Sequence, residues 1–84
     1  MDADLRVNSR RVVGFRQLVK HLKKGDVSRV FLAKDAQEEM REEIARLAQP
    51  QGVPVTEVPT MAELGEMCGI AVGSAAAGLL REPE

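Results

Sequence analysis

Hydrophobic positions in the first third of the chain predict a strand followed by an amphipathic helix. Residues 10–13 are short, β-branched and apolar at their end, and they stop at Gly14, which is typical of a strand. Apolar residues then recur at i, i+3, i+4 and i+7, which places them on one face of a helix. These residues are Phe15, Leu18, Val19 and Leu22. Gly25 provides a stop signal for this helix after Lys24.

The middle third repeats the same order. Residues 28–33 form a nearly continuous apolar run of strand length, which is typical of a buried parallel strand. Asp35 predicts a helix N-cap, because Glu38 follows three residues later in a capping-box pattern. This helix should end before Pro50.

The pattern continues with a strand and a short helix. Residues 53–58 alternate as a strand does, and Pro54 favours a position where its missing N–H does no harm. Thr60 predicts the cap of a helix that ends near Gly69. Residues 74–80 are ambiguous because alanine favours helix, but the rhythm of the chain favours a closing strand, which we predict. The fold class is therefore α/β, with helices covering a mixed sheet.

Length and composition limit the function. The 84 residues make one domain with room for a single core. Phe15 and Phe31 are the only aromatic residues, so stacking platforms for single-stranded nucleic acid are excluded. Cys68 and His21 are the only thiol and imidazole, so one chain holds neither a disulfide nor a Cys/His zinc cluster. We expect no cofactor and no metal, and a reducing compartment such as the cytoplasm.

No segment suits a membrane. The longest weakly polar stretch, residues 67–80, is interrupted by glycines and is too short to span a bilayer. The acidic start, residues 1–4, is unlike a signal peptide. We expect a soluble intracellular monomer with no membrane partner, whose ends, residues 1–4 and 81–84, are mobile.

The net charge of −1 conceals an uneven distribution. Residues 5–25 contain seven basic residues and no acidic residue. The basic residues are Arg6, Arg10, Arg11, Arg16, Lys20, Lys23 and Lys24. A solvated face would normally intersperse both signs. This run favours a polyanionic partner, and phosphate backbones are the commonest one.

The candidates for catalysis are weak. His21 has no second catalytic group nearby in sequence, and Cys68 is better interpreted as a buried, inert thiol. Four glutamates in the second helix predict an acidic solvated face rather than an acid/base or metal site. They are Glu38, Glu39, Glu42 and Glu43. We therefore predict no catalytic residue and no enzyme.

A glycine-bracketed apolar loop, residues 69–73, is the other unusual feature. Ile70 and Val72 are branched and apolar, and exposing them is unfavourable unless they are covered. Two interpretations stay open: these side chains pack on the core, or they form an apolar surface for a flat partner such as an unstacked base.

Three motifs together resemble one family. They are residues 14–20 (GFRQLVK) opening a helix, residues 33–36 (AKDA) after a strand, and residues 64–70 (LGEMCGI) before an apolar tail. Their order and spacing resemble the L7Ae/L30e family of ribosomal-protein-like RNA binders, in particular its small bacterial members, over about residues 10–80. The resemblance implies a three-layer α/β/α fold with about four strands and a ribonucleoprotein role, with ribosome association a further expectation.

The family resemblance also implies a site that grips kink-turn RNA at its tandem sheared G·A pairs. Gly14 would let the backbone approach the RNA, and Arg16, Gln17 and Lys20 would contact base edges and phosphates. As our own assignment beyond the resemblance, Lys23 and either Arg10 or Lys34 would add phosphate contacts. The loop would cover an extruded base with Ile70, Ala71 and Val72.

This chain departs from the family at Arg16-Gln17, where many members carry Asn-Glu. Gln17 still has a donor and an acceptor for a base edge. Arg16 cannot accept, so we assign it to a phosphate or a guanine acceptor. The alternative function is a protein–protein adaptor whose basic helix docks an acidic partner. An enzyme acting on a small anionic substrate is the weakest alternative.

Overall fold

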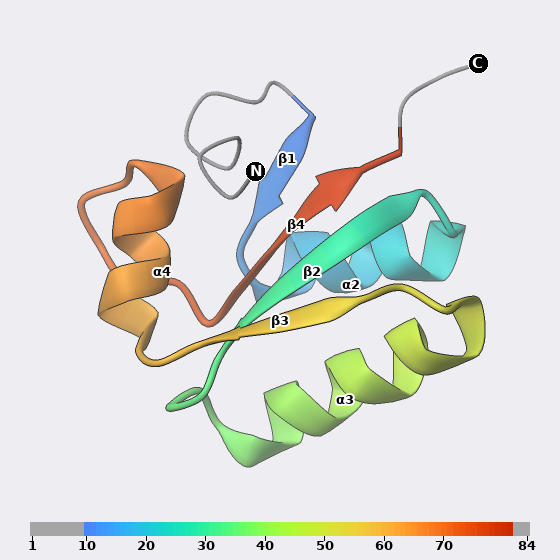
Figure 1. Ribbon diagram of the computed structural model, residues 1–84, viewed down its shortest axis with the longest axis horizontal. Coiled ribbons are helices and arrows are strands. Elements are labelled where there is room, and N and C mark those ends of the chain that lie inside the picture. The colour runs from blue at the N-terminus through green and yellow to red at the C-terminus, as the bar shows by residue number, and fades with distance from the viewer. Residues whose placement is uncertain (1–9, 82–84) are drawn as a thin grey trace.

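A computed structural model of the chain describes residues 10–81. The predictions for residues 1–4, Arg6 and residues 82–84 lie outside the described residues. Strands and helices alternate along the chain (Figure 1). The elements are β1 (Arg11–Val13), α2 (Phe15–Lys24), β2 (Val27–Ala33), α3 (Glu38–Ala48), the 3-10 helix η1 (Gln49–Gln51), β3 (Val55–Val58), α4 (Met61–Cys68) and β4 (Ala76–Leu80).

The four strands form one mixed sheet in the order β1-β4-β2-β3. β2 and β3 are parallel, with Val30 opposite Val55, whereas β4 runs antiparallel to both β1 and β2. The carboxyl ends of β1, β2 and β3 therefore lie at the same edge as the start of β4. We call this edge, where Gly14, Lys34, Pro59 and Ala75 adjoin the strands, the carboxyl edge.

Helices cover the sheet on both faces, which confirms the predicted three-layer α/β/α arrangement. Leu18 and Leu22 of α2 and Ile44 of α3 pack into one cluster with Val30 and Leu32 of β2. On the other face, α4 builds a second cluster (Figure 1). This second cluster consists of Phe31, Ala33, Ala36, Val58, Leu64, Cys68 and Ala77.

The closing segment is a strand, β4, as we predicted, and its small residues have a packing reason. Gly78 pairs with both Val12 and Val30 in the middle of the sheet. A Cβ atom at Gly78 would lie 2.6 Å from Leu18 Cδ1 and 3.1 Å from the Arg29 carbonyl oxygen. Close packing against α2 therefore requires glycine in this strand, whereas local propensity alone does not favour a strand there.

Two predicted details are wrong. Asp35 does not cap α3, because the N-cap is Gln37 and Asp35 Oδ1 instead accepts a hydrogen bond from the Met61 N–H at 2.8 Å. The buried Ala36 is part of a turn that delays the start of the helix. The third strand begins at Val55 rather than Val53, whose N–H bonds the Ala48 carbonyl.

Pro54 and Thr60 behave as predicted. β3 is an edge strand, and Pro54 precedes it with a carbonyl that accepts from the Val30 N–H. Thr60 caps α4 by accepting a hydrogen bond from the Glu63 N–H at 3.1 Å. None of the helices between residues 10 and 81 is long and apolar enough to cross a membrane.

Candidate functional site

The site begins at Gly14, which links β1 to α2 at the carboxyl edge. Its φ of 101° and ψ of 152° are open to glycine but strongly unfavourable for other residues. The Gly14 N–H donates to the Ala76 carbonyl at 2.8 Å, so the start of α2 is fixed to the start of β4. A Cβ atom at Gly14 would meet nothing within 4 Å. The backbone is therefore open to a partner at this point.

The N-terminus of α2 has no side-chain cap and no acidic residue in its first turn. Unbonded N–H groups and the helix dipole give such an end a partial positive charge, which attracts anions and acceptor atoms. Arg16 and Gln17, in that first turn, are exposed. This end of α2, comprising Gly14, Arg16 and Gln17, is called the α2 tip below. It offers donors to an anionic or acceptor-rich partner.

Lys20 belongs with the α2 tip, but Lys23 does not. Lys20 is exposed and lies four residues after Arg16 and three after Gln17, hence on the same side of the helix. Lys23 is also exposed, but nine residues separate it from Gly14, which is about 13 Å along the helix axis. The structure therefore places Lys23 at the opposite end of α2.

The apolar loop after α4 divides between core and surface. α4 ends at Cys68, and Gly69 takes the left-handed conformation. Ile70 is half-buried and packs against the second core cluster, whereas Val72 is 71% exposed. Ala71 is exposed as well. Ile70 therefore packs on the core, as the first interpretation predicts, and Val72 has the exposure that the second interpretation requires.

The end of this loop meets the α2 tip. The Ser74 N–H donates to the Met61 carbonyl at 3.1 Å, and Ser74 Oγ donates to the Ala76 carbonyl at 2.8 Å. That same Ala76 carbonyl accepts from Gly14. Gly14 and Ser74, sixty residues apart in sequence, are therefore joined through one backbone oxygen at the carboxyl edge, whereas the start of the loop, at Gly69 and Ile70, lies beside Arg11 at the opposite edge.

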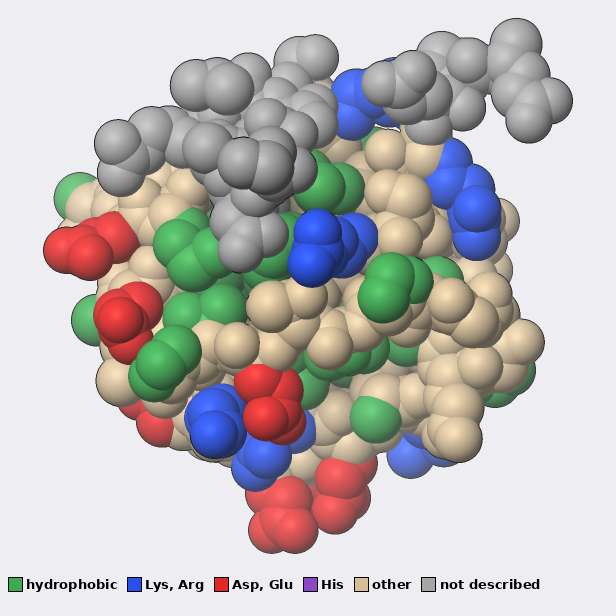
Figure 2. Space-filling view, in the orientation of Figure 1, with side chains coloured by type: hydrophobic (Ala, Val, Ile, Leu, Met, Phe, Trp, Pro, Cys, Tyr) green, Lys and Arg blue, Asp and Glu red, His purple; other side chains and the backbone are tan. Residues whose placement is uncertain are grey.

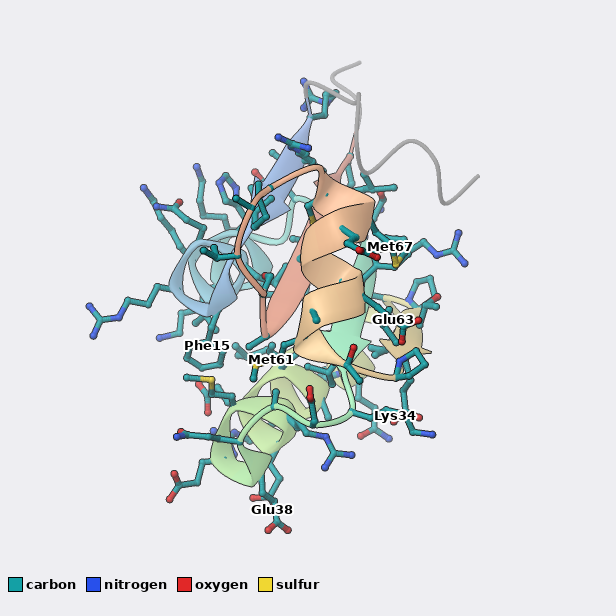
Figure 3. All side chains as sticks on the ribbon, turned by 90° about the vertical axis from the view of Figure 1, so that its left-hand side faces the viewer. Phe15, Lys34, Glu38, Met61, Glu63 and Met67 are labelled. Atoms are coloured by element: carbon teal, nitrogen blue, oxygen red, sulfur yellow. The ribbon has the colours of Figure 1, made fainter. Side chains whose placement is uncertain are left out.

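Lys34 follows β2 at the same edge, but on the far side of β4 from Gly14. The Ala33 N–H donates to the Ala75 carbonyl at 3.0 Å, which fixes the end of β2 beside the start of β4. Two strand spacings, about 10 Å, therefore separate Lys34 from Gly14. Seen from this end, Phe15 and Lys34 lie on opposite sides with Met61 between them (Figure 3). Lys34 is exposed and bounds the site on the α4 side.

Two residues at this end, and Arg11 at the opposite edge, were missed by sequence reasoning. Met61 fits the apolar stripe of α4, yet it is 37% exposed at the carboxyl edge. Gly65 packs against the Val72 carbonyl so closely that a Cβ atom would lie 2.1 Å from that oxygen. Arg11 Nη1 donates to the Cys68 carbonyl and so holds the end of α4. An arginine inside an apolar strand was the only signal for the last of these.

His21 and Asp26 form an ion pair at the other end of α2. His21 Nδ1 lies 3.1 Å from Asp26 Oδ1. Desolvation of the Asp26 carboxyl acts to raise its pKa, but the hydrogen bond and charge of His21, with the charge of Lys24, lower that pKa overall. His21 therefore has a structural partner at the helix end and lies away from the α2 tip.

Cys68 is buried, as predicted. Its side chain is fully inaccessible, and burial raises the pKa of the thiol, although the charge of Arg11 acts in the opposite direction. A neutral, inaccessible thiol is a poor nucleophile. Among residues 10–81, no three His, Cys, Asp or Glu side chains gather into a metal site.

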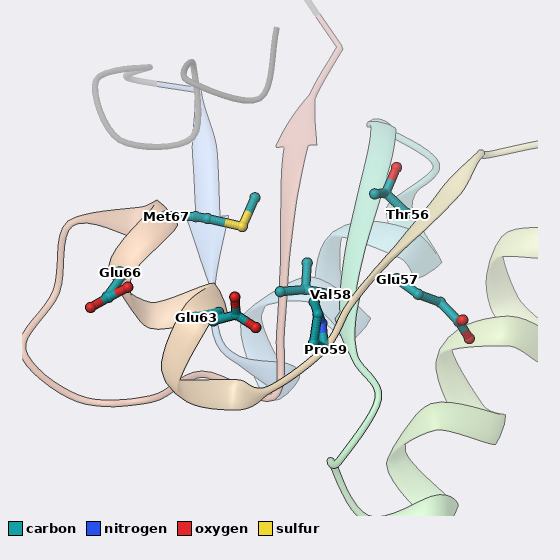
Figure 4. A pocket seen from close by; sticks show the side chains of 7 residues that line it. All are labelled: Thr56, Glu57, Val58, Pro59, Glu63, Glu66 and Met67. Carbon is teal, nitrogen blue, oxygen red and sulfur yellow. The ribbon is translucent and has the colours of Figure 1, made fainter.

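A hollow of about 410 Å³ lies between β3 and α4 (Figure 4). Its lining combines the carboxylates of Glu63 and Glu66 with the apolar side chains of Val58 and Met67. Acidic side chains also border the face of the molecule that carries this hollow (Figure 2). The hollow therefore has the wrong charge for a polyanion, and the cationic α2 tip is the better candidate site.

The chain is similar to known proteins of one family. The sequence profile of the Ribosomal protein L7Ae/L30e/S12e/Gadd45 family matches residues 3–83. "RNA-binding protein TTE2299" of Caldanaerobacter subterraneus subsp. tengcongensis is 41% identical over 68 residues, 81% of this chain and 83% of that protein. "RNA-binding protein YbxF" of Geobacillus stearothermophilus is 40% identical over 70 residues, 83% of this chain and 85% of that protein.

A solved structure shares the fold. It is a protein with unknown function from Bacillus halodurans, and it superposes with a TM-score of 0.82 at 22% identity. The match covers 93% of this chain and 81% of the other.

Proposed function

The chain is an RNA-binding protein of the ribosomal protein L7Ae/L30e/S12e/Gadd45 family, and we propose that the RNA it recognises and stabilises is the kink-turn. The proposed target is a sharply bent RNA with tandem sheared G·A pairs and one extruded base. The protein acts without catalysis, by holding the bent form. Its cytoplasmic location, its monomeric state and any association with the ribosome belong to the same proposal.

One observation supports this proposal above the others: a single carbonyl, that of Ala76, accepts from both Gly14 of the α2 tip and Ser74, the residue that follows the exposed apolar loop. Regular A-form RNA hides its base edges in a deep, narrow groove, so a protein that reads them needs a distortion. A bent corner presents base edges, crowded phosphates and an unstacked base together. The uncapped α2 tip suits the edges and phosphates, and Val72 suits the unstacked base.

The roles divide by chemistry. Gln17 and Lys20 contact base edges, because an amide and an ammonium can bond the acceptors of guanine. Arg16 contacts a phosphate or a guanine acceptor. Gly14 lets the backbone approach the RNA, since it has no side chain and open space beside it.

The loop supplies the apolar cover. Val72 contacts the extruded base directly because it is the most exposed large apolar residue of the described chain. Ala71 lies beside it, and Ile70 anchors the loop to the core. Lys34 contributes a phosphate contact from the other side of β4, and Lys23 contributes one from the far end of α2.

The test compares two RNAs of matched composition, a kink-turn and a straight duplex, over a salt series. We expect tighter binding to the kink-turn at every salt concentration, because cation contacts alone depend on salt but do not distinguish shape. Equal affinity for the two RNAs would overturn the kink-turn proposal. The Val72→Asp variant should lose the preference, with Val55→Asp, an exposed valine on β3, as the matched control.

A further inference from the structure

We propose that α2 contacts RNA along its whole exposed length, so that the protein also holds the phosphate backbone of one duplex arm leaving the bent corner. This inference rests on the proposed function, because it takes the α2 tip as the corner-binding end. It adds a second surface, and it commits that surface to double-stranded RNA.

Four cations form one stripe on the exposed side of α2, which we call the α2 stripe. They are Arg16, Lys20, Lys23 and Lys24, and all four are exposed. Their spacing of i, i+4, i+7 and i+8 places them on one face of a helix. Eight residues at 1.5 Å each make the stripe about 12 Å long. The opposite face, with Leu18 and Leu22, is fully buried against the sheet.

Like charges within the stripe oppose helix stability, although the helix dipole favours Lys23 and Lys24 in the last turn. Arg16 with Lys20, and Lys20 with Lys24, are like-charged pairs at i, i+4, which destabilise a helix by about 0.2–0.5 kcal/mol each. Arg16 also lies in the first turn, where the helix dipole disfavours a cation. α2 has no acidic residue that could relieve this repulsion. An anionic partner along the helix would relieve it over the full length.

The acidic residues are segregated from the stripe. Glu38, Glu39 and Glu42 are exposed on α3, and Glu63 and Glu66 are exposed on α4. The view onto the α4 side of the sheet shows acidic side chains along its border, whereas α2 lies behind the sheet in that view (Figures 1 and 2). Near the stripe, the carboxyl of Asp26 is paired with His21. Although α3 packs on the same face of the sheet as α2, it carries three exposed glutamates, so the polyanion is directed to α2 itself rather than to α3 or α4.

The stripe continues past the end of the helix. Arg81 lies beside Gly25, with its Nε donating to the Gly25 carbonyl at 3.3 Å and its N–H donating to the Asp26 carbonyl. The guanidinium of Arg10 in turn donates to the Arg81 carbonyl, with Nη2 at 2.6 Å. These bonds place two further cations at the edge opposite the α2 tip. The positive surface therefore runs from the corner-binding end across the molecule.

A duplex arm fits this surface better than a single strand or an acidic protein. The exposed side of α2 carries no aromatic residue on which bases could stack, which is what single-strand binding needs. A straight row of flexible lysines suits closely spaced phosphates, and duplexes present them at high density. Such lysine–phosphate contacts contribute affinity without reading the base sequence of the RNA.

The experiment measures how affinity depends on arm length. The probes are one kink-turn RNA with both arms long, and two RNAs in which one arm at a time is shortened to the pairs flanking the kink. Wild type should lose about tenfold in affinity when one particular arm is shortened. The Lys24→Ala variant should lose about fivefold on the long-armed RNA, with a salt slope shallower by about one, but bind the shortened RNA as wild type does.

Controls separate this surface from general charge. Arg46→Ala removes an exposed cation from α3 and should leave all affinities within twofold. The inference is wrong if shortening neither arm weakens wild type, or if the Lys24→Ala variant loses the same factor on every RNA. A kink-turn preference that persists in either case would leave the proposed function standing. The absence of any preference for the kink would instead overturn the proposed function.

Discussion

Gln17 and Lys20 are neighbours on the exposed side of α2. Replacing either one leaves the buried face of the helix unchanged. Both side chains reach outward, while the buried face of the helix is provided by leucines. We expect Gln17→Ala or Lys20→Ala to weaken kink-turn binding by about 1–3 kcal/mol, because each removes a base-edge contact. Mobility-shift titration measures this.

The matched control for this pair is Gln37→Ala, an exposed amide at the start of α3 whose side chain makes no cap. It should bind RNA as wild type does. Unchanged affinity in the Gln17 and Lys20 variants would remove these two residues from the interface.

The backbone conformation of Gly14 gives a second prediction. Gly14→Ala should cost about 1–3 kcal/mol of stability, because its backbone conformation is open only to glycine. It should also weaken RNA binding, since a methyl group would stand where the RNA approaches the backbone. Chemical denaturation and RNA titration measure the two effects separately.

Gly52→Ala is its control. Gly52 also has a positive φ, 68°, and open space where a Cβ atom would lie, but it follows η1, far from the α2 tip. It should lose stability and keep its RNA affinity. Equal losses of affinity in both variants would show that Gly14 acts only through stability.

Where apolar residues recur with a regular spacing, the sequence predicts which residues are exposed. In a loop without such a spacing, it does not. In α2, apolar spacing alone separates Leu18 and Leu22 from the cations. In the loop after α4, Ile70 and Val72 have the same character and two-residue spacing, yet one packs on the core and the other faces solvent. Only the three-dimensional course of the loop, set by contacts with Gly65 and Met61, decides between them.

At the level of the elements, α4 packs closely against the loop that follows it. Gly65→Ala would bring a methyl group to 2.1 Å from the Val72 carbonyl oxygen, so the loop backbone must shift. We expect a loss of about 1–3 kcal/mol in stability from overpacking. RNA affinity should also fall, because the displaced loop misplaces Val72. Denaturation and RNA titration of the variant test this.

Ala62→Ser, at an exposed position of the same helix, should change neither quantity by much. A Gly65→Ala protein that is destabilised but binds kink-turn RNA normally would show that the loop does not contact RNA.

Element prediction succeeds where local signals and packing agree. Thr60 with Glu63 gives α4 its start, and Gly25 ends α2 in the left-handed conformation. It fails at Asp35, because the Asp35 side chain bonds a distant helix rather than its own, a long-range contact that a capping pattern cannot reveal. Residues 76–80 form a strand because they pair with β1 on one side and β2 on the other, and not because of their local propensity.

For the molecule as a whole, Cys68 gives a prediction about alkaline pH. Burial raises the pKa of its thiol above the ordinary 9.0, against the smaller effect of Arg11. Above pH 9.0 the unfolded chain therefore loses this proton before the folded protein does, and the free energy of unfolding falls as pH rises. Denaturation at pH 8 and pH 10 should show the fall.

The Cys68→Val variant has no titrating group at this position. Its free energy of unfolding should therefore fall less between pH 8 and pH 10. An equal loss in both proteins would mean that the thiol does not contribute.

The joining of remote segments could not be predicted from residue patterns alone. Charge counts indicate a polyanion, and periodicity gives the fold class. Neither shows that the α2 tip, after β1, meets the loop before β4, because that depends on strand order. The resemblance to the family supplied that expectation, and the bond from Gly14 to Ala76 brings the two segments together.

The bonds between Arg10 and Arg81 have a practical consequence for handling the protein. Residues 10 and 81, where the described chain enters and leaves the fold, adjoin each other at the edge opposite the α2 tip. A fluorophore or surface linker attached at residue 81 would therefore lie at that edge and leave the corner-binding end turned outward. A short peptide joining residues 10 and 81, with the chain reopened at the exposed turn of Gly52, would preserve the order of the strands in the sheet.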